Sequence, residues 1–132
     1  MSLALRLEHI AFNVADPVAT AAWYRANLGL KIVRAGTDPA RTHFVATADG
    51  AVMLELYCNP AAPVPAYAQK HFLELHLAFV SRDPQADAAT LCAAGATVAE
   101  AFKTTPAGDE MIMLRDPFGL CVQLVKRREP ML

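Results

Sequence analysis

The chain has no long apolar run, although apolar residues make up 55% of its 132 positions. A helix that crosses a membrane needs about 20 consecutive apolar residues, and no uninterrupted run of that kind occurs. The first residues also lack the basic segment and apolar core of a secretory signal. We therefore expect a cytoplasmic protein with no membrane partner.

The chain also has few cysteines and almost no net charge. The three cysteines, Cys58, Cys92 and Cys121, are widely separated and form no CxxC pair, which excludes a zinc knuckle and a disulfide framework. We expect them to be buried, reduced thiols. The formal charge is −1, and the only basic cluster, residues 126–128, is followed at once by Glu129. Because a nucleic-acid site needs a basic stripe interleaved with aromatics, we expect no nucleic-acid partner.

What the sequence does contain is an internal repeat. The segment His9-Ile-Ala-Phe-Asn-Val-Ala-Asp16-Pro17 returns as His76-Leu-Ala-Phe-Val-Ser-Arg-Asp83-Pro84, at an offset of 76 − 9 = 67 residues. Repetition of a supersecondary unit indicates two copies that pair to bury a shared face. The repeated element is a strand that carries a histidine and leads into a helix.

Each copy predicts the order βαβββ. Asp16 and Asp83 are good N-caps, Pro17 and Pro84 suit the first helical turn, and a glycine ends each helix. Alternating apolar and polar residues predict the strands. The expected elements are strand 5–14, helix 16–29 and strands 31–35, 42–48 and 51–58, then strand 73–81, helix 83–95 and strands 97–103, 110–116 and 120–126.

The repeat predicts a single α+β domain over residues 1–132 that contains two modules, 5–58 and 72–127. Between them, residues 59–71 hold three prolines, which predict an extended and fairly stiff connection. Each helix is expected to cover the apolar side of its sheet, so that the histidine side stays free of helices.

Four polar side chains occupy equivalent places in the two copies. His9 and His76 lie in the first strands, and Glu55 and Gln123 lie among apolar neighbours in the last strands. Two imidazoles with a carboxylate suit a divalent metal ion that keeps open positions for a substrate.

Each of these residues also has a purely structural interpretation. A strand histidine is often a hydrogen-bonded core residue, a carboxylate can pair with an arginine, and a glutamine can sit at a sheet edge. Their joint placement on equivalent strands favours a shared site. Glu74, two positions before His76, is a second possible carboxylate on the same face.

The motifs together resemble those of the vicinal oxygen chelate superfamily, which includes glyoxalase I, methylmalonyl-CoA epimerase, extradiol dioxygenases, fosfomycin-resistance enzymes and bleomycin-binding proteins. The resemblance covers nearly the whole chain. It implies that the two modules pair into a cupped eight-stranded mixed sheet with the helices on its convex face. It rests on the two histidine segments, Trp23-Tyr-Arg-Ala-Asn-Leu-Gly-Leu30, Leu54-Glu-Leu56 and Asp116-Pro-Phe-Gly-Leu-Cys-Val-Gln123.

The resemblance also implies the chemistry. It makes His9, Glu55, His76 and Gln123 the ligands of a divalent ion, which is Zn, Ni, Mn or Fe. Relatives of the glyoxalase kind carry a glutamate where this chain has Gln123, and an amide cannot accept a proton, so Glu55 remains as the candidate base. We expect a metal-dependent, glyoxalase-like lyase or isomerase that acts on a small oxygen-chelating substrate.

Alternatives stay open at this point. The foremost is a protein that sequesters a small molecule without chemistry, as bleomycin-resistance proteins do, and a dioxygenase or thiol transferase is another. We expect a homodimer, because two-module chains of this family commonly pair. Weaker candidates for contacts with the substrate are Tyr57, Arg41, His43 and Arg115.

Overall fold

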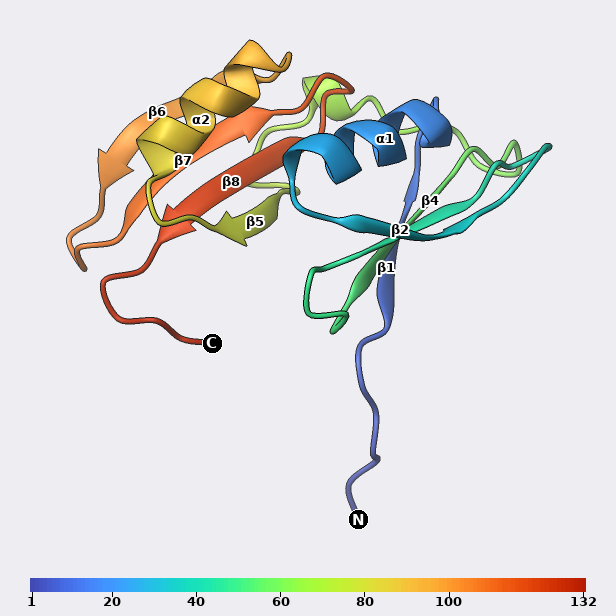
Figure 1. The fold of residues 1–132 in the computed structure, drawn as a ribbon, viewed down its shortest axis with the longest axis horizontal. Coiled ribbons are helices and arrows are strands. Elements are labelled where there is room, and N and C mark those ends of the chain that lie inside the picture. The colour runs from blue at the N-terminus through green and yellow to red at the C-terminus, as the bar shows by residue number, and fades with distance from the viewer. The chain divides into compact units, whose positions relative to one another are not determined.

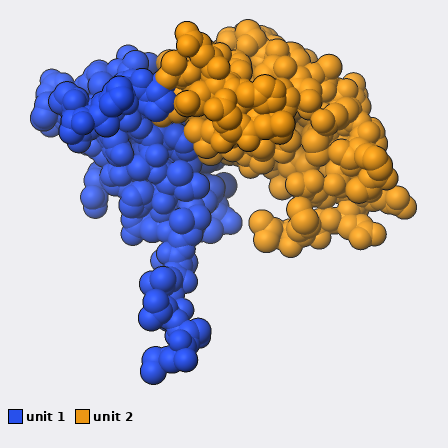
Figure 2. Space-filling view, turned by 180° about the vertical axis from the view of Figure 1, so that it is seen from behind, with its two compact units in different colours: residues 1–65 blue, residues 66–132 orange.

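The computed structural model describes all residues 1–132 and divides into two compact units. Unit 1 comprises Met1–Pro65 and unit 2 comprises Ala66–Leu132, shown in blue and orange in Figure 2. Each unit contains one four-stranded sheet and one α-helix, so the expected α+β class is confirmed. Neither helix is long and apolar enough to cross a membrane.

Unit 1 has the order βαβββ. Its strands lie in the sheet order β1-β4-β3-β2, with β1 parallel to β4 and the other pairs antiparallel. The elements are β1 (His9–Asn13), α1 (Pro17–Asn27), β2 (Lys31–Ala35), β3 (His43–Ala46) and β4 (Met53–Tyr57), and Figure 1 labels all of them except β3.

Unit 2 repeats this arrangement. Its sheet has the order β5-β8-β7-β6, again with the first and last strands of the unit parallel. A short 3-10 turn, η1, precedes the sheet. The elements are η1 (Tyr67–Gln69), β5 (Leu77–Val80), α2 (Pro84–Ala93), β6 (Thr97–Thr104), β7 (Glu110–Arg115) and β8 (Cys121–Lys126).

The two helices begin in the same way, as the repeated Asp-Pro pair predicts. The Asp16 Oδ1 atom accepts a hydrogen bond from the Ala19 amide at 3.0 Å, and Asp83 Oδ1 accepts one from Ala86 at 3.1 Å. A proline follows each cap, where its missing N–H costs no helical hydrogen bond. The helix starts are therefore encoded locally.

Each helix packs on one face of its own sheet. In unit 1, Ala21 and Tyr24 of α1 are buried, as are Val45 and Leu56 of the strands that α1 contacts. In unit 2, Leu91 of α2 is buried in the same manner. We call the opposite side of each sheet its open face. Because side chains alternate along a strand, His9 and Glu55 project on the open face of unit 1.

The first strand of each unit is shorter than predicted. Strand β1 begins at His9 instead of Leu5, and β5 begins at Leu77 instead of Leu73. The parallel partner β4 starts only at Met53, whose amide donates to the carbonyl of Glu8 at 2.8 Å. Earlier residues of the first strand have no partner strand with which to form a ladder.

Side chains anchor the proline-rich connection inside each unit. The Asn13 amide nitrogen donates to the carbonyls of Asn59 at 3.2 Å and Ala62 at 2.9 Å. The Arg115 guanidinium donates to the carbonyls of Tyr67 at 3.0 Å and Lys70 at 2.6 Å. The second part of the connection forms η1, so the prediction of a wholly extended segment is wrong there.

Candidate functional site

The parallel pairing of β1 with β4 brings His9 and Glu55 together. Ala11 lies beside Glu55 in the register, and His9 is two residues before Ala11 on the same face. The His9 Nε2 and Glu55 Oε1 atoms are 3.6 Å apart. Two ligands held at about 2.1 Å from one tetrahedral ion lie about 3.4 Å apart, so this pair has the spacing of neighbouring ligands.

Glu8 holds the other side of the His9 ring. Its Oε1 atom lies 2.9 Å from His9 Nδ1, within hydrogen-bond distance. A neutral imidazole that donates from Nδ1 keeps its lone pair on Nε2, the nitrogen that faces Glu55. Carboxylates that orient a ligating histidine in this way are common around metal ions. The sequence prediction missed Glu8. The only sign of its role in the sequence is that this acidic residue directly precedes His9.

Unit 2 holds the corresponding two residues, although His76 lies just before β5 and not within it. Gln123 lies beside Ala78 in the β5–β8 register, and His76 is two residues before Ala78. The His76 Nδ1 atom donates to the carbonyl of Phe72 at 2.8 Å, so here too the lone pair falls on Nε2. The Gln123 amide nitrogen lies 3.7 Å from the Met111 sulfur, which leaves its carbonyl oxygen free of protein donors.

Each unit therefore has one pair of ligand-type side chains. No group of three or more His, Cys, Asp and Glu side chains is spaced to hold an ion. Glu74 lies in a turn before β5, where its Oε2 atom accepts the backbone amide of His71 at 2.7 Å. The expectation that Glu74 shares the face of His76 is wrong, since β5 begins only after it.

Three of the weaker candidates have structural roles. His43 is buried on the helix-covered side, and its Nδ1 donates to the Arg41 carbonyl at 2.7 Å. Arg41 pairs with Asp16, with 3.6 Å between NH1 and Oδ1, and Arg115 holds the connection. Tyr57 lies on the open face of unit 1, because it is two residues after Glu55 in β4.

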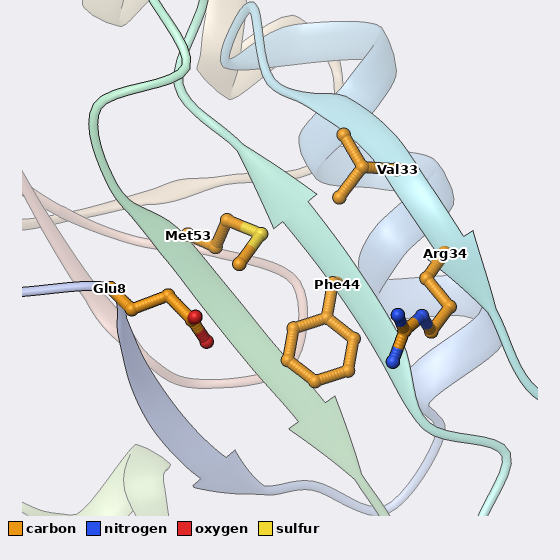
Figure 3. A pocket seen from close by; sticks show the side chains of 5 residues that line it. All are labelled: Glu8, Val33, Arg34, Phe44 and Met53. Atoms are coloured by element: carbon orange, nitrogen blue, oxygen red, sulfur yellow. The ribbon is translucent and has the colours of Figure 1, made fainter.

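A shallow pocket of about 270 Å³ lies on the open face of unit 1, and its lining includes Glu8, which contacts His9 (Figure 3). The Phe44 ring forms its floor and meets the His9 ring edge-on, with 5.8 Å between centroids. The Arg34 guanidinium lies 5.6 Å from the Phe44 centroid. The sequence prediction did not identify Arg34 or Phe44. The lining residues are Glu8, Val33, Arg34, Phe44 and Met53.

The open face of unit 2 is more apolar. A larger pocket of about 580 Å³ lies where β5 and β8 end, and Ala78, Val80, Val125 and residues 130–132 contribute to its wall. At the start of β8 the thiol of Cys121 is buried, and burial raises its pKa, which makes it a poor nucleophile. Cys58 and Cys92 are only half-buried, so the expectation of three buried thiols is correct for one.

Comparison with known proteins identifies the family of this chain. The family model of the Glyoxalase/Bleomycin resistance protein/Dioxygenase superfamily matches residues 6–124. The chain belongs to this superfamily. No curated protein matches the chain.

Solved structures share the fold at low identity. An antibiotic binding protein, TnmS3 from Streptomyces sp. CB03234, is 22% identical with a TM-score of 0.73, covering 96% of this chain and 99% of its own. A superfamily enzyme from Burkholderia phytofirmans PsJN is 17% identical with a TM-score of 0.73, covering 92% and 98%. A member from Sphaerobacter thermophilus DSM 20745 is 19% identical with a TM-score of 0.68, covering 93% and 98%. The likeness establishes the two-module superfamily fold.

Proposed function

We propose that this superfamily member binds a divalent metal ion through His9, Glu55, His76 and Gln123 and acts as a glyoxalase-like lyase or isomerase. The observation that supports this proposal best is that the His9 and His76 rings are oriented by the same kind of contact. In both rings Nδ1 is engaged, by the Glu8 carboxylate and by the Phe72 carbonyl, so that Nε2 is the free ligand atom. His43 has the same Nδ1 arrangement but is buried on the helix-covered side, whereas His9 and His76 are each only partly buried.

The donor set fits a divalent cation. Two imidazole nitrogens, one carboxylate and one amide oxygen suit Zn, Ni, Mn or Fe. When bound, such an ion would polarise the oxygen of a small chelating substrate. Of the four side chains only Glu55 is a carboxylate that can accept a proton from substrate carbon, because the Gln123 amide cannot. The Glu55 side chain is 22% exposed, so it is both shielded and reachable.

A second candidate function is the sequestration of a small molecule without chemistry. Two observations favour it: Gln123 contacts the Met111 sulfur, and the pocket of unit 2 has apolar walls. The antibiotic binding protein from Streptomyces is a structural relative of that kind. In this case the open faces would bind an apolar ligand, and metal uptake would not be needed.

Calorimetric titration with Zn, Ni and Mn tests the first function. Alanine at His9, Glu55 or His76 should weaken uptake by about tenfold or more while the fold persists, because each change removes a ligand. His71→Ala is the matched control, since His71 is an exposed histidine of unit 2. No uptake by the wild-type protein would favour sequestration, and wild-type affinity in His76→Ala would refute the four-ligand set.

We also propose that the protein is a cytoplasmic homodimer. The first strand of each unit is an edge strand, and it exposes Ile10 by 43% and Val80 by 83%. Exposed apolar edges are commonly covered by a second chain. Free cysteines are typical of a reducing compartment. Light scattering should give a mass near twice 14.2 kDa, and a mass of one chain would contradict the dimer.

A further inference from the structure

One row of side chains crosses the open face of unit 1 from a carboxylate to a cation. The registers pair Glu55 with Phe44, and Phe44 with Arg34. Neighbouring strands are about 4.8 Å apart, so the backbones of Glu55 and Arg34 are separated by about 10 Å. Phe44 lies between them, and His9 touches its edge. The row therefore links the candidate metal ligands to an arginine across an aromatic floor.

A β-bulge places the arginine in this row. Ile32 pairs with Val45 and Arg34 pairs with Phe44, so Val33 is an extra residue in β2. With regular pairing, Val33 would lie opposite Phe44 and the arginine would project on the helix side. The bulge brings both side chains to the pocket, as Figure 3 shows. Bulges commonly redirect side chains beside functional sites.

The Arg34 guanidinium has no carboxylate partner. It lies over the Phe44 ring, whereas four other Lys and Arg side chains of the protein form ion pairs with Asp or Glu. The next row of paired residues on this face also ends in a cation. It begins at His9, passes through Met53 and Ala46, and ends at Lys31. Both rows thus end in a cation at β2.

We propose that Arg34 determines specificity by binding the carboxylate of a single-ring or unsaturated acid whose flat part lies on Phe44 and Met53. The opposite end of this ligand carries an oxygen that reaches the His9–Glu55 pair. The chelating end rests on the proposed function, whereas the carboxylate end rests on Arg34 alone.

The charges around the pocket fix this orientation. Glu8 and Glu55 are both at the β1–β4 end, where they repel an anion, and Arg34 is at the β2 end, where it attracts one. An arginine fork matches the two oxygens of a carboxylate. A pocket of about 270 Å³ is at the small end of ligand sites, which suits one ring better than a larger molecule.

The test compares an acid with its neutral amide. Calorimetry of the purified chain, with and without saturating Zn, would measure affinities for 4-hydroxycinnamate and 4-hydroxycinnamamide. The wild-type protein should prefer the acid by about tenfold, the value of one charge-assisted pair. Arg34→Gln should abolish the preference, and Arg34→Lys should restore part of it. Arg25→Gln, an exposed arginine of α1, is the control and should behave as wild type.

The outcomes separate the two proposals. Acid preference that depends on Arg34 supports the inference even if no metal is taken up, in which case the metal-dependent function fails alone. Metal uptake combined with equal affinity for acid and amide overturns the inference and leaves the metal site standing. Binding of neither probe, or an equal loss of preference in Arg25→Gln, also overturns it.

Discussion

The two units share a backbone plan and differ in the chemistry of their open faces. Both pair the first and last strands in parallel, with an alanine beside the ligand-type residue of the last strand. In unit 1 that residue is Glu55, with Glu8 and Arg34 nearby. In unit 2 it is Gln123, beside Met111. One scaffold can therefore carry a charged face or a largely apolar one, because the face depends on alternate strand residues and the fold on the others.

The comparison extends to the turn before the last strand, where Gly50 and Gly119 both have positive φ, +72° and +99°. A Cβ on Gly119 would lie 2.7 Å from the Ala68 amide nitrogen, whereas one on Gly50 would meet nothing within 4 Å. Gly50→Ala should lower the free energy of unfolding by about 1 kcal/mol through backbone strain. Gly119→Ala should lower it by about 3 kcal/mol or more, because the clash with backbone adds to the strain.

Urea unfolding followed by circular dichroism measures both changes. Equal losses in the two variants would mean that the segment of Ala68 shifts at little cost, and the contrast between the turns would disappear.

Gln123→Glu should make the pair of unit 2 more like that of unit 1. The added negative charge should tighten Zn, Ni and Mn binding by about tenfold, and it introduces a second candidate base. Calorimetry gives the affinity, and turnover of the hemithioacetal of methylglyoxal and glutathione tests the base. Gln69→Glu, at an exposed position of η1, is the control for charge. Unchanged affinity in Gln123→Glu would argue that this position is no ligand.

Glu8→Gln is expected to have the smallest effect. The amide oxygen can still accept from His9 Nδ1, but the carboxylate charge that strengthens the ligand is lost. We expect metal affinity to fall about threefold, less than the tenfold or more that is typical when an orienting partner is removed, as in Glu8→Ala. Nitrogen chemical shifts of the His9 ring should report Nε2 as the unprotonated atom in the wild-type protein without metal. Glu129→Ala, at an exposed position, is the control. If Glu8→Ala and Glu129→Ala bind the metal with the same affinity, Glu8 does not orient His9 as a ligand.

Features encoded within a few residues could be predicted from the sequence. The Asp-Pro helix starts and the order βαβββ follow from caps, alternation and the internal repeat. The first residues of β1 and β5 could not be predicted, because they depend on where the partner strands β4 and β8 begin, far along the chain.

Side-chain roles that depend on neighbouring strands were also missed. The place of Arg34 opposite Phe44 requires the bulge at Val33, and a register shift leaves no mark in the pattern of β2. Glu8 looks like any exposed acid, and its contact with His9 arises because it lies just outside the alternating strand. His43 looked like a substrate contact, but the pairing of β3 with β4 turns it to the helix side.

The anchoring of the proline-rich connection has a consequence for protein engineering. Asn13 holds residues up to Pro63, and Arg115 holds residues from Tyr67 onward, so each unit fixes its own part of the connection. A cut between Pro65 and Ala66 breaks none of these hydrogen bonds. Those of Asn13 stay in the first fragment, and those of Arg115 stay in the second. The two fragments, expressed as separate polypeptides, would each keep a complete βαβββ module, which makes this bond a natural place for a split reporter or a circular permutation.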